Sequence, residues 1–170
     1  VLDVETALWY LATSNVIANF DSYYVGKNYY LYLGQRDPRF HVVPWDLGLS
    51  FGLFGLQNNP GGRPPGGGAV DSVRVSPFVQ ETDANRPLIR RLLAVPAYRA
   101  DYVAHYRAFV AEVFTPEWVE RIGAAYQDVI REAVRDEAET SGRVAGAFTF
   151  AQFESNLRTQ ISTGGGRPAR

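Results

Sequence analysis

The 170-residue chain contains no cysteine, no methionine and a single lysine, Lys27. Without cysteine it forms no disulfide and offers no thiolate to a metal, so the compartment is left open. A net charge of −1 excludes a general basic field for nucleic acid or anionic lipid. No signal peptide is visible, and no apolar run reaches the roughly 18 residues of a membrane-spanning helix.

Several enzyme signatures are also missing. The chain has no phosphate-binding Gly-Lys loop, no Gly-x-Ser-x-Gly and no dinucleotide fingerprint. His41 and His105 have no second His or Cys at the spacing of a zinc site. Hydrolase chemistry of the nucleophile-elbow type and zinc chemistry therefore have no support in the sequence.

Aromatic residues are abundant, with ten Tyr and ten Phe, so a sizeable core is possible. The length predicts one domain or one large lobe, which we place at residues 1–163. Within it, Gly and Pro predict a flexible loop at about residues 56–76. The tail at 164–170 is expected to be disordered.

The first half predicts a helix followed by a hairpin. Apolar spacing indicates a helix over residues 1–18, and Asn-Phe-Asp-Ser at 19–22 ends it. The aromatic segment 28–33 and the segment 40–44 read as strands around a turn that contains Asp37-Pro38. Because the chain begins within a helical pattern, we expect its N-terminus to be a cut inside a larger protein.

The second half predicts helices. A short one covers 87–94, the next opens at Pro96, and a third starts after Thr115 and runs to about Glu137. A capping box at Thr149 opens a last helix. The order predicts an α+β fold in which a small antiparallel sheet packs on a mainly helical body.

Two acids mark the candidate site. Asp21 lies in the loop before the first strand, and Asp46 follows the second strand. Two acids that converge with the amide of Asn28 at strand ends can hold a divalent cation and a phosphate chain. The structural alternatives are a loop-shaping Asx turn for Asp21 and a turn or helix-capping role for Asp46.

The residues NFDSYYVGKNYYLY, followed by FHVVPWDLGLSFG, resemble the CotH spore-coat kinase family. The resemblance covers roughly residues 5–160 and implies an atypical kinase fold. It implies ATP, a divalent cation (Mg²⁺, or another such as Mn²⁺ or Ca²⁺) and a protein serine or threonine as substrate. A spore-coat, cell-surface or secreted location is also implied, with a coat or surface protein as partner.

The resemblance also suggests roles for individual residues. Asp21 is implied to be catalytic, and Asp46 is implied to be a metal ligand, with Asn28 as an amide ligand beside it. Phe40, on the strand before Pro-Trp-Asp, is implied to pack on the nucleotide base. Lys27 is the only lysine available to the phosphates.

Two departures from the family pattern bear on activity. Many relatives carry a second acid two residues after the first, where this chain has Gly48. The lobe that supplies a kinase with its phosphate-binding lysine and partner glutamate is not in this chain, so we interpret it as the C-terminal lobe of a longer protein. The alternatives are a pseudokinase-like structural or binding module, and a metal-binding surface domain, perhaps for Ca²⁺, without a nucleotide.

Overall fold

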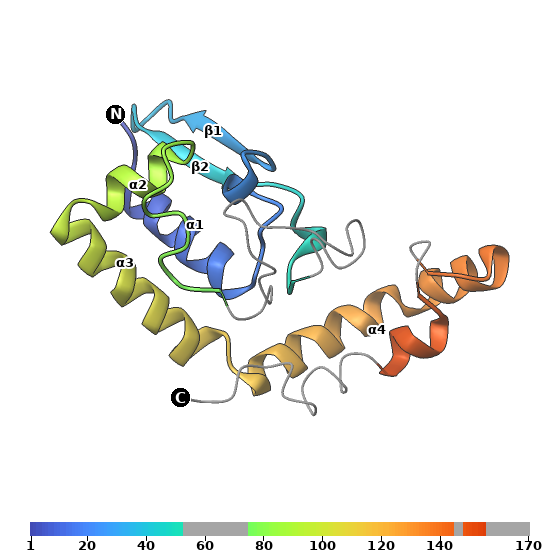
Figure 1. Ribbon diagram of the computed structural model, residues 1–170. Coiled ribbons are helices and arrows are strands. Elements are labelled where there is room, and N and C mark those ends of the chain that lie inside the picture. The colour runs from blue at the N-terminus through green and yellow to red at the C-terminus, as the bar shows by residue number, and fades with distance from the viewer. Residues whose placement is uncertain (53–74, 145–147, 156–170) are drawn as a thin grey trace. The chain divides into compact units, whose positions relative to one another are not determined.

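The computed structural model describes residues 1–52, 75–144 and 148–155. These residues belong to two compact units, Val1–Val110 and Ala111–Arg170 (Figure 1). Most of the loop expected at 56–76, and all of the tail expected at 164–170, lie outside the described residues.

The first unit is built around helix α1, Val4–Val16. Asp3 caps it, because its carboxylate accepts a hydrogen bond from the Thr6 backbone N–H at 3.4 Å. The helix contacts α3, α2 and strand β2, so apolar residues are buried on several of its sides. The expected first helix is confirmed and forms the centre of the core, whose α1 members are Ala7, Leu8, Tyr10, Leu11 and Ala12.

The hairpin consists of β1, Tyr29–Leu33, and β2, Phe40–Pro44 (Figure 1). The strands are antiparallel, and their register runs from Tyr29 opposite Pro44 to Leu33 opposite Phe40. The predicted hairpin is therefore confirmed. Val42 is buried where β2 meets α1, whereas residues 30–33 of β1 are exposed.

Two helices complete the first unit. Helix α2 spans Pro87–Leu93 and helix α3 spans Pro96–Ala108, and each begins with the proline that the sequence indicated. Their buried side chains, Ile89, Leu92, Leu93 and Tyr102, join the α1 core. A π-helical turn, Phe109–Val113, follows α3.

Buried tyrosines connect these elements through their hydroxyl groups. The Tyr10 hydroxyl accepts from the Tyr23 backbone N–H at 3.3 Å, and the Tyr23 hydroxyl accepts from the Leu88 N–H at 2.8 Å. The Tyr24 hydroxyl donates to the Leu11 carbonyl at 3.2 Å. Each hydroxyl thus ties the loop at 19–25 to a helix, and burial raises the pKa of all three tyrosines above the ordinary value.

The second unit is dominated by α4, Pro116–Ser141. Thr115 caps it by accepting from the Trp118 N–H at 3.2 Å, which confirms the predicted start. The helix runs past the expected end near Glu137 and stops at Gly142, whose φ of +73° provides a left-handed C-cap. No α4 residue is buried among the described parts of the chain.

A short helical segment at 150–155 follows, and its capping box is confirmed. The Gln152 N–H donates to Thr149 Oγ1 at 3.2 Å, and the Thr149 N–H donates to Gln152 Oε1 at 2.8 Å. Arg131 of α4 pairs with Glu154 at 2.8 Å. The rest of the helix expected after Thr149 lies outside the described residues.

The architecture is α+β, with a two-stranded antiparallel sheet among helices, as the sequence predicted. Among the residues described, none of the helices combines the length and the apolar character needed to span a bilayer.

The buried tyrosines predict a loss of stability in alkali. Burial raises the pKa of Tyr10, Tyr23, Tyr24 and Tyr102 above the ordinary tyrosine value of 10.0. Stability from their neutral hydroxyls is therefore complete below that value and is lost as the pH rises toward each folded-state pKa. We expect the urea midpoint to fall between about pH 9 and pH 11.5, in step with tyrosinate absorbance. Tyr24→Phe should reduce this fall in the urea midpoint. Tyr126→Phe is the control, because Tyr126 is an exposed tyrosine of α4, and it should leave the fall as it is. A urea midpoint that does not change with pH would contradict the prediction.

Candidate functional site

The loop that carries Asp21 is closed by its own polar residues. The Ser22 hydroxyl donates to the Asn19 carbonyl at 2.7 Å, and Gly26, with φ +84°, ends the short 3-10 turn Tyr23–Val25. Asn, Asp and Ser compete well for backbone groups, which is why the helix gives way to this compact turn. Asp21 is buried, with an exposed fraction of only 3%.

Two of the predicted site residues bind Asp21 directly. Asn28 Nδ2 donates to the Asp21 carbonyl at 2.7 Å and to its carboxylate Oδ2 at 3.0 Å. Lys27 Nζ lies 2.6 Å from Oδ1, at ion-pair distance, although Oδ1 accepts no well-aligned hydrogen bond. The Lys27 side chain stays about half exposed. Asp21 is thus a buried carboxylate with one oxygen bonded to an amide and the other paired with a half-exposed ammonium.

Asp46 lies at the end of β2 and is exposed. The Trp45 N–H donates to the Asn28 carbonyl at 3.2 Å, so the residue before Asp46 is bonded to the residue that binds Asp21. After Asp46 the chain forms the 3-10 turn η2, Leu47–Leu49, and returns to the same loop.

Two further backbone bonds fix that return. The Phe51 N–H donates to the Ile17 carbonyl at 2.6 Å, and the Gly52 N–H donates to the Ala18 carbonyl at 3.3 Å. The segment of Asp46 is therefore held at both ends against the loop of Asp21. This bracket of main-chain bonds keeps the segment of Asp46 beside the loop of Asp21.

Left-handed backbone concentrates on the same segments. Ala18, Asn28, Asp46 and Phe51 all have φ between +50° and +61°, and Gln80 is the one further non-glycine case in the described chain. This conformation costs roughly 1–2 kcal/mol for most L-residues. Strain that gathers at candidate ligand positions is typical of functional sites, where surrounding structure holds an unfavourable backbone.

Phe40 is not brought together with these residues. It pairs with Leu33 at the turn end of the hairpin, and its backbone is bonded to Val1 and Asp3. Pro44, at the Asp46 end, lies about 13 Å further along the strand. The base-stacking role of Phe40 stays a prediction from the resemblance, without support from position.

An aromatic pair lies nearer to Asp46 than Phe40 does in the strand register. Tyr30 and Trp45 are both more than half exposed, and their rings meet edge to face at 5.6 Å between centroids. In the antiparallel register Tyr30 lies opposite Val43, and Trp45 follows two residues later on the same face, so the two rings meet diagonally across the hairpin.

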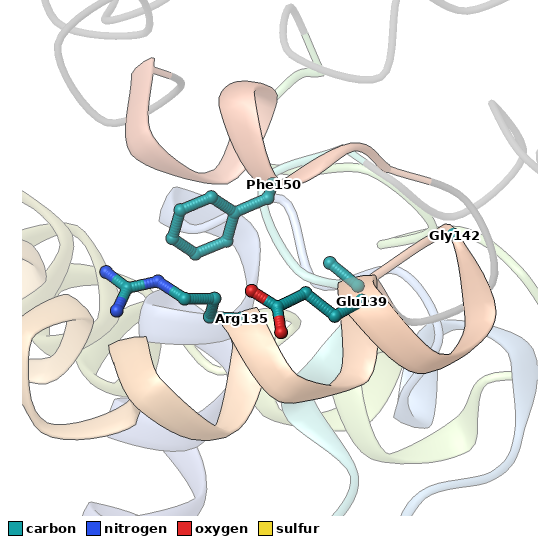
Figure 2. A pocket seen from close by; sticks show the side chains of 5 residues that line it. Arg135, Glu139, Gly142 and Phe150 are labelled. Atoms are coloured by element: carbon teal, nitrogen blue, oxygen red, sulfur yellow. The ribbon is translucent and has the colours of Figure 1, made fainter.

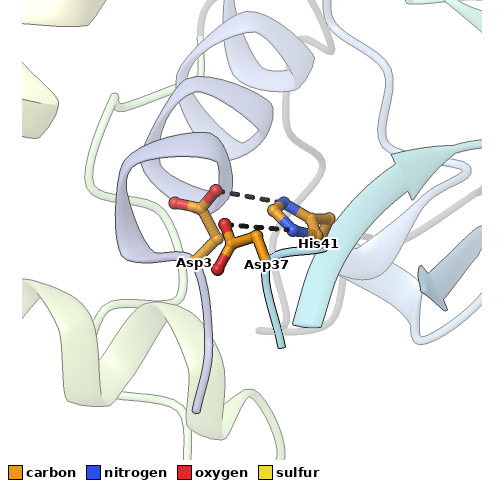
Figure 3. Close-up of side chains that lie close together, drawn as sticks. All are labelled: Asp3, Asp37 and His41. Carbon is orange, nitrogen blue, oxygen red and sulfur yellow. Dashed lines mark ion pairs between the residues drawn. The ribbon is translucent and has the colours of Figure 1, made fainter. Parts of the chain in front are cut away.

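A second group of acids lies at the opposite end of the hairpin (Figure 3). Asp3 Oδ2 is 3.0 Å from His41 Nδ1, and Asp37 Oδ2 is 3.7 Å from His41 Nε2. Their ligand atoms could hold a metal ion in principle. However, Arg39 Nε bonds Asp37 at 2.8 and 2.7 Å and lowers the pKa of that carboxyl, and its Nη1 lies 3.4 Å from Asp3. The Arg39 guanidinium pairs closely with Asp37 and also contacts Asp3, so the group is an ion-pair cluster of these residues with His41.

The second unit has an open pocket of about 410 Å³ (Figure 2). Arg135 stacks over the Phe150 ring at 5.4 Å in its wall. None of the predicted site residues lines this pocket, whose lining is Arg135, Ala138, Glu139, Gly142 and Phe150.

Asn28 is predicted to stabilise the loop that carries Asp21. Asn28→Ala removes both side-chain bonds to Asp21 and places a methyl group at φ +56°, so we expect a loss of about 2–3 kcal/mol in unfolding free energy. Asn28→Gly loses the same bonds but relieves the backbone, and should cost about 1 kcal/mol less. Urea denaturation measures both; equal losses would show that the backbone strain has no energetic weight.

Comparison with known proteins gives one match. The family model described as CotH kinase protein matches residues 1–162. Searches of curated proteins and of solved structures returned no match. The family match covers the hairpin, the Asp21 loop and the helices that follow, and it agrees with the resemblance carried by Asn-x-Asp and Pro-Trp-Asp. The chain belongs to the CotH kinase family.

Proposed function

We propose that this chain is the C-terminal lobe of a CotH-type protein kinase, which transfers the γ-phosphate of ATP to a serine or threonine hydroxyl of a protein. The observation that carries the proposal is the bracket of backbone bonds that holds the segment of Asp46 against the loop of Asp21. Membership of the family supplies the reaction class. Substrates in a spore coat, on a cell surface or in a secreted protein are part of the proposal.

Asp21 is proposed to orient the substrate hydroxyl and to receive its proton. Asn28 fixes the carboxylate through Oδ2, which leaves the orientation of Oδ1 to the ion pair with Lys27. Orientation of the hydroxyl is proposed to be the larger part of the role. Phosphoryl transfer tolerates a weak base, because its loose transition state depends mostly on positioning and charge.

Lys27 is proposed to exchange partners when nucleotide binds. Its half-exposed side chain lies at the edge of the site, and no other lysine exists in the chain. A flexible ammonium can move from a carboxylate to a phosphate oxygen at little cost, because both are anionic acceptors. When Lys27 leaves Asp21, the carboxylate oxygen Oδ1 would become available to accept a hydrogen bond from the substrate hydroxyl.

The donor set fits a hard divalent cation such as Mg²⁺. Asp46 presents an exposed carboxylate, and Asn28 uses its amide nitrogen on Asp21, which leaves its amide oxygen as a ligand atom. One or two protein ligands suffice for Mg²⁺ when phosphate oxygens and waters complete the shell. When bound, the ion would neutralise charge on the phosphates. Mn²⁺ or Ca²⁺ would use the same oxygens. The exposed pair of Tyr30 and Trp45, which adjoins Asp46 in the chain, would offer an aromatic surface to the base.

A pseudokinase-like structural or binding module is the second candidate, and Gly48 favours it. The place of the second family acid is filled by a residue without a ligand atom. Binding of ATP with Mg²⁺ but no transfer of labelled phosphate by the full-length protein would select this candidate. A metal-binding surface domain would instead bind Ca²⁺ without any response to ATP.

The two aspartates are expected to be essential for transfer. Asp21→Asn and Asp46→Asn keep the side-chain volume but remove a carboxylate, so we expect each to lower ³²P transfer by the full-length protein at least 10²-fold. Asp37→Asn serves as the matched control, because Asp37 belongs to the ion-pair cluster at the other end of the hairpin. Transfer retained by either active-site variant, with circular dichroism unchanged, would remove that residue from its role.

Gly48→Asp is expected to strengthen metal binding. A Cβ built at Gly48 meets Asp46 Oδ1 at 3.5 Å, an ordinary contact, and Gly48 does not have the positive φ that would strain a side chain. The new carboxylate would therefore lie beside that of Asp46 and should tighten Mn²⁺ or Mg²⁺ binding about tenfold in isothermal titration. Gly48→Asn, which adds bulk without charge, is the control; equal affinities in both variants would contradict a cation site at Asp46.

A further inference from the structure

The turn that follows Asp21 is held from outside by the chain between residues 75 and 86. Two side chains of this segment donate to one backbone oxygen, because Gln80 Nε2 and Arg86 Nε each lie 2.8 Å from the Tyr24 carbonyl. A carbonyl oxygen has two lone pairs, so both of these bonds can form together. The turn therefore depends on this segment as well as on its own hydrogen bonds.

Arg86 also covers the glycine at which this turn ends. A Cβ built on Gly26 would lie 3.8 Å from Arg86 Nη1, 3.9 Å from Nη2 and 4.0 Å from Cζ. Because these three distances are nearly equal, the flat face of the guanidinium lies against Gly26. Arg86 Nη1 donates to the Asn85 carbonyl at 2.9 Å, and the Nε bond to Tyr24 fixes the other side of the group. The guanidinium plane is thus held in place over the glycine.

Gly26 separates the anchored part of the turn from the candidate site residues. Tyr24 before it is buried, whereas Lys27 directly after it is about half exposed and places its ammonium 2.6 Å from Asp21 Oδ1. Glycine has more backbone conformations open to it than any other residue, and Gly26 adopts a φ of +84°. A contact that restrains Gly26 therefore sets the direction in which Lys27 leaves the turn.

We propose that Arg86 is a positioning residue, which holds Gly26 so that Lys27 points at Asp21. The planar guanidinium suits this role, because it lies flat along the backbone at Gly26 while its Nε bonds the Tyr24 carbonyl. The consequence for nucleotide binding rests on the proposed function, in which Lys27 moves from Asp21 to a phosphate. The effect of Arg86 on the ion pair does not depend on that function.

Three substitutions separate the contact with Gly26 from the bond to Tyr24. Arg86→Gln places an amide nitrogen where arginine has Nε, so the bond to the Tyr24 carbonyl is kept while the outer part of the guanidinium is removed. Arg86→Lys keeps the positive charge without the plane. Gln80→Met is the matched control, because it removes the other 2.8 Å bond to the same carbonyl and leaves Arg86 over Gly26.

The mobility of the Lys27 side chain measures the effect of these substitutions. Lys27 is the only lysine, so the 170-residue chain grown with ¹³C-lysine gives a single ε-CH₂ signal, whose relaxation yields an order parameter. We expect Arg86→Gln and Arg86→Lys to lower this order parameter to its value in Asp21→Asn, where the ion pair is absent. Gln80→Met should leave it unchanged.

Three outcomes would overturn the proposal. One is an order parameter as high in Arg86→Gln as in the wild type, with circular dichroism showing that the variant is folded. Another is full order in Arg86→Lys, since charge alone would then suffice. The third is an equal fall in Gln80→Met, which would assign the effect to the Tyr24 carbonyl. Should Arg86→Gln fail to fold, Arg86→Lys carries the same test.

Phosphate transfer by the full-length protein tests the consequence for the nucleotide. We expect Arg86→Gln to raise the KM for ATP about fivefold and to leave kcat within about twofold, because Asn28 still holds the Asp21 carboxylate. An unchanged KM would overturn this consequence. Wild-type protein that transfers no phosphate would overturn the proposed function, while the order parameter of Lys27 would still decide the role of Arg86.

Discussion

Main-chain hydrogen bonds between the chain after β2 and the loop after α1 hold the candidate site together. Trp45 is bonded to Asn28 at one end, and Phe51 and Gly52 are bonded to Ile17 and Ala18 at the other. Such bonds join backbone groups rather than particular side chains. The segments that carry the two aspartates therefore form a backbone frame that the rest of the first unit supports, above all helix α1. Side-chain bonds of Asn28 and buried tyrosine hydroxyls then fix the loop on that frame.

Much of this organisation could be predicted from residues that act locally. Thr115-Pro116 and Thr149 carry complete start signals, and both capped helices begin where expected. The hairpin strands follow from an aromatic run and a turn between them. Helix α4 ends four residues beyond the predicted end at Glu137. It continues to Ser141 because Gly142, in a left-handed conformation, provides the C-cap.

The site was only partly accessible from sequence. Asn28 and Lys27 are close to Asp21 in the chain, and both do bind it, although Lys27 was assigned to the nucleotide. Phe40 was chosen by its place on the strand before Pro-Trp-Asp, but the strand is long enough to carry it to the far end of the hairpin. The bonds between residues 51–52 and 17–18 join segments more than thirty positions apart, and no local pattern reports such a pairing.

The single lysine has a practical consequence. Apart from the α-amino group, the ε-amine of Lys27 is the only amine in a chain that also lacks thiols, and it is paired with a buried carboxylate. Acylation or carbamylation would abolish its charge and leave Asp21 facing a neutral, bulkier neighbour. Among side chains, an amine-directed label would thus react at this one position, and shielding from that label would reveal occupancy by an anion.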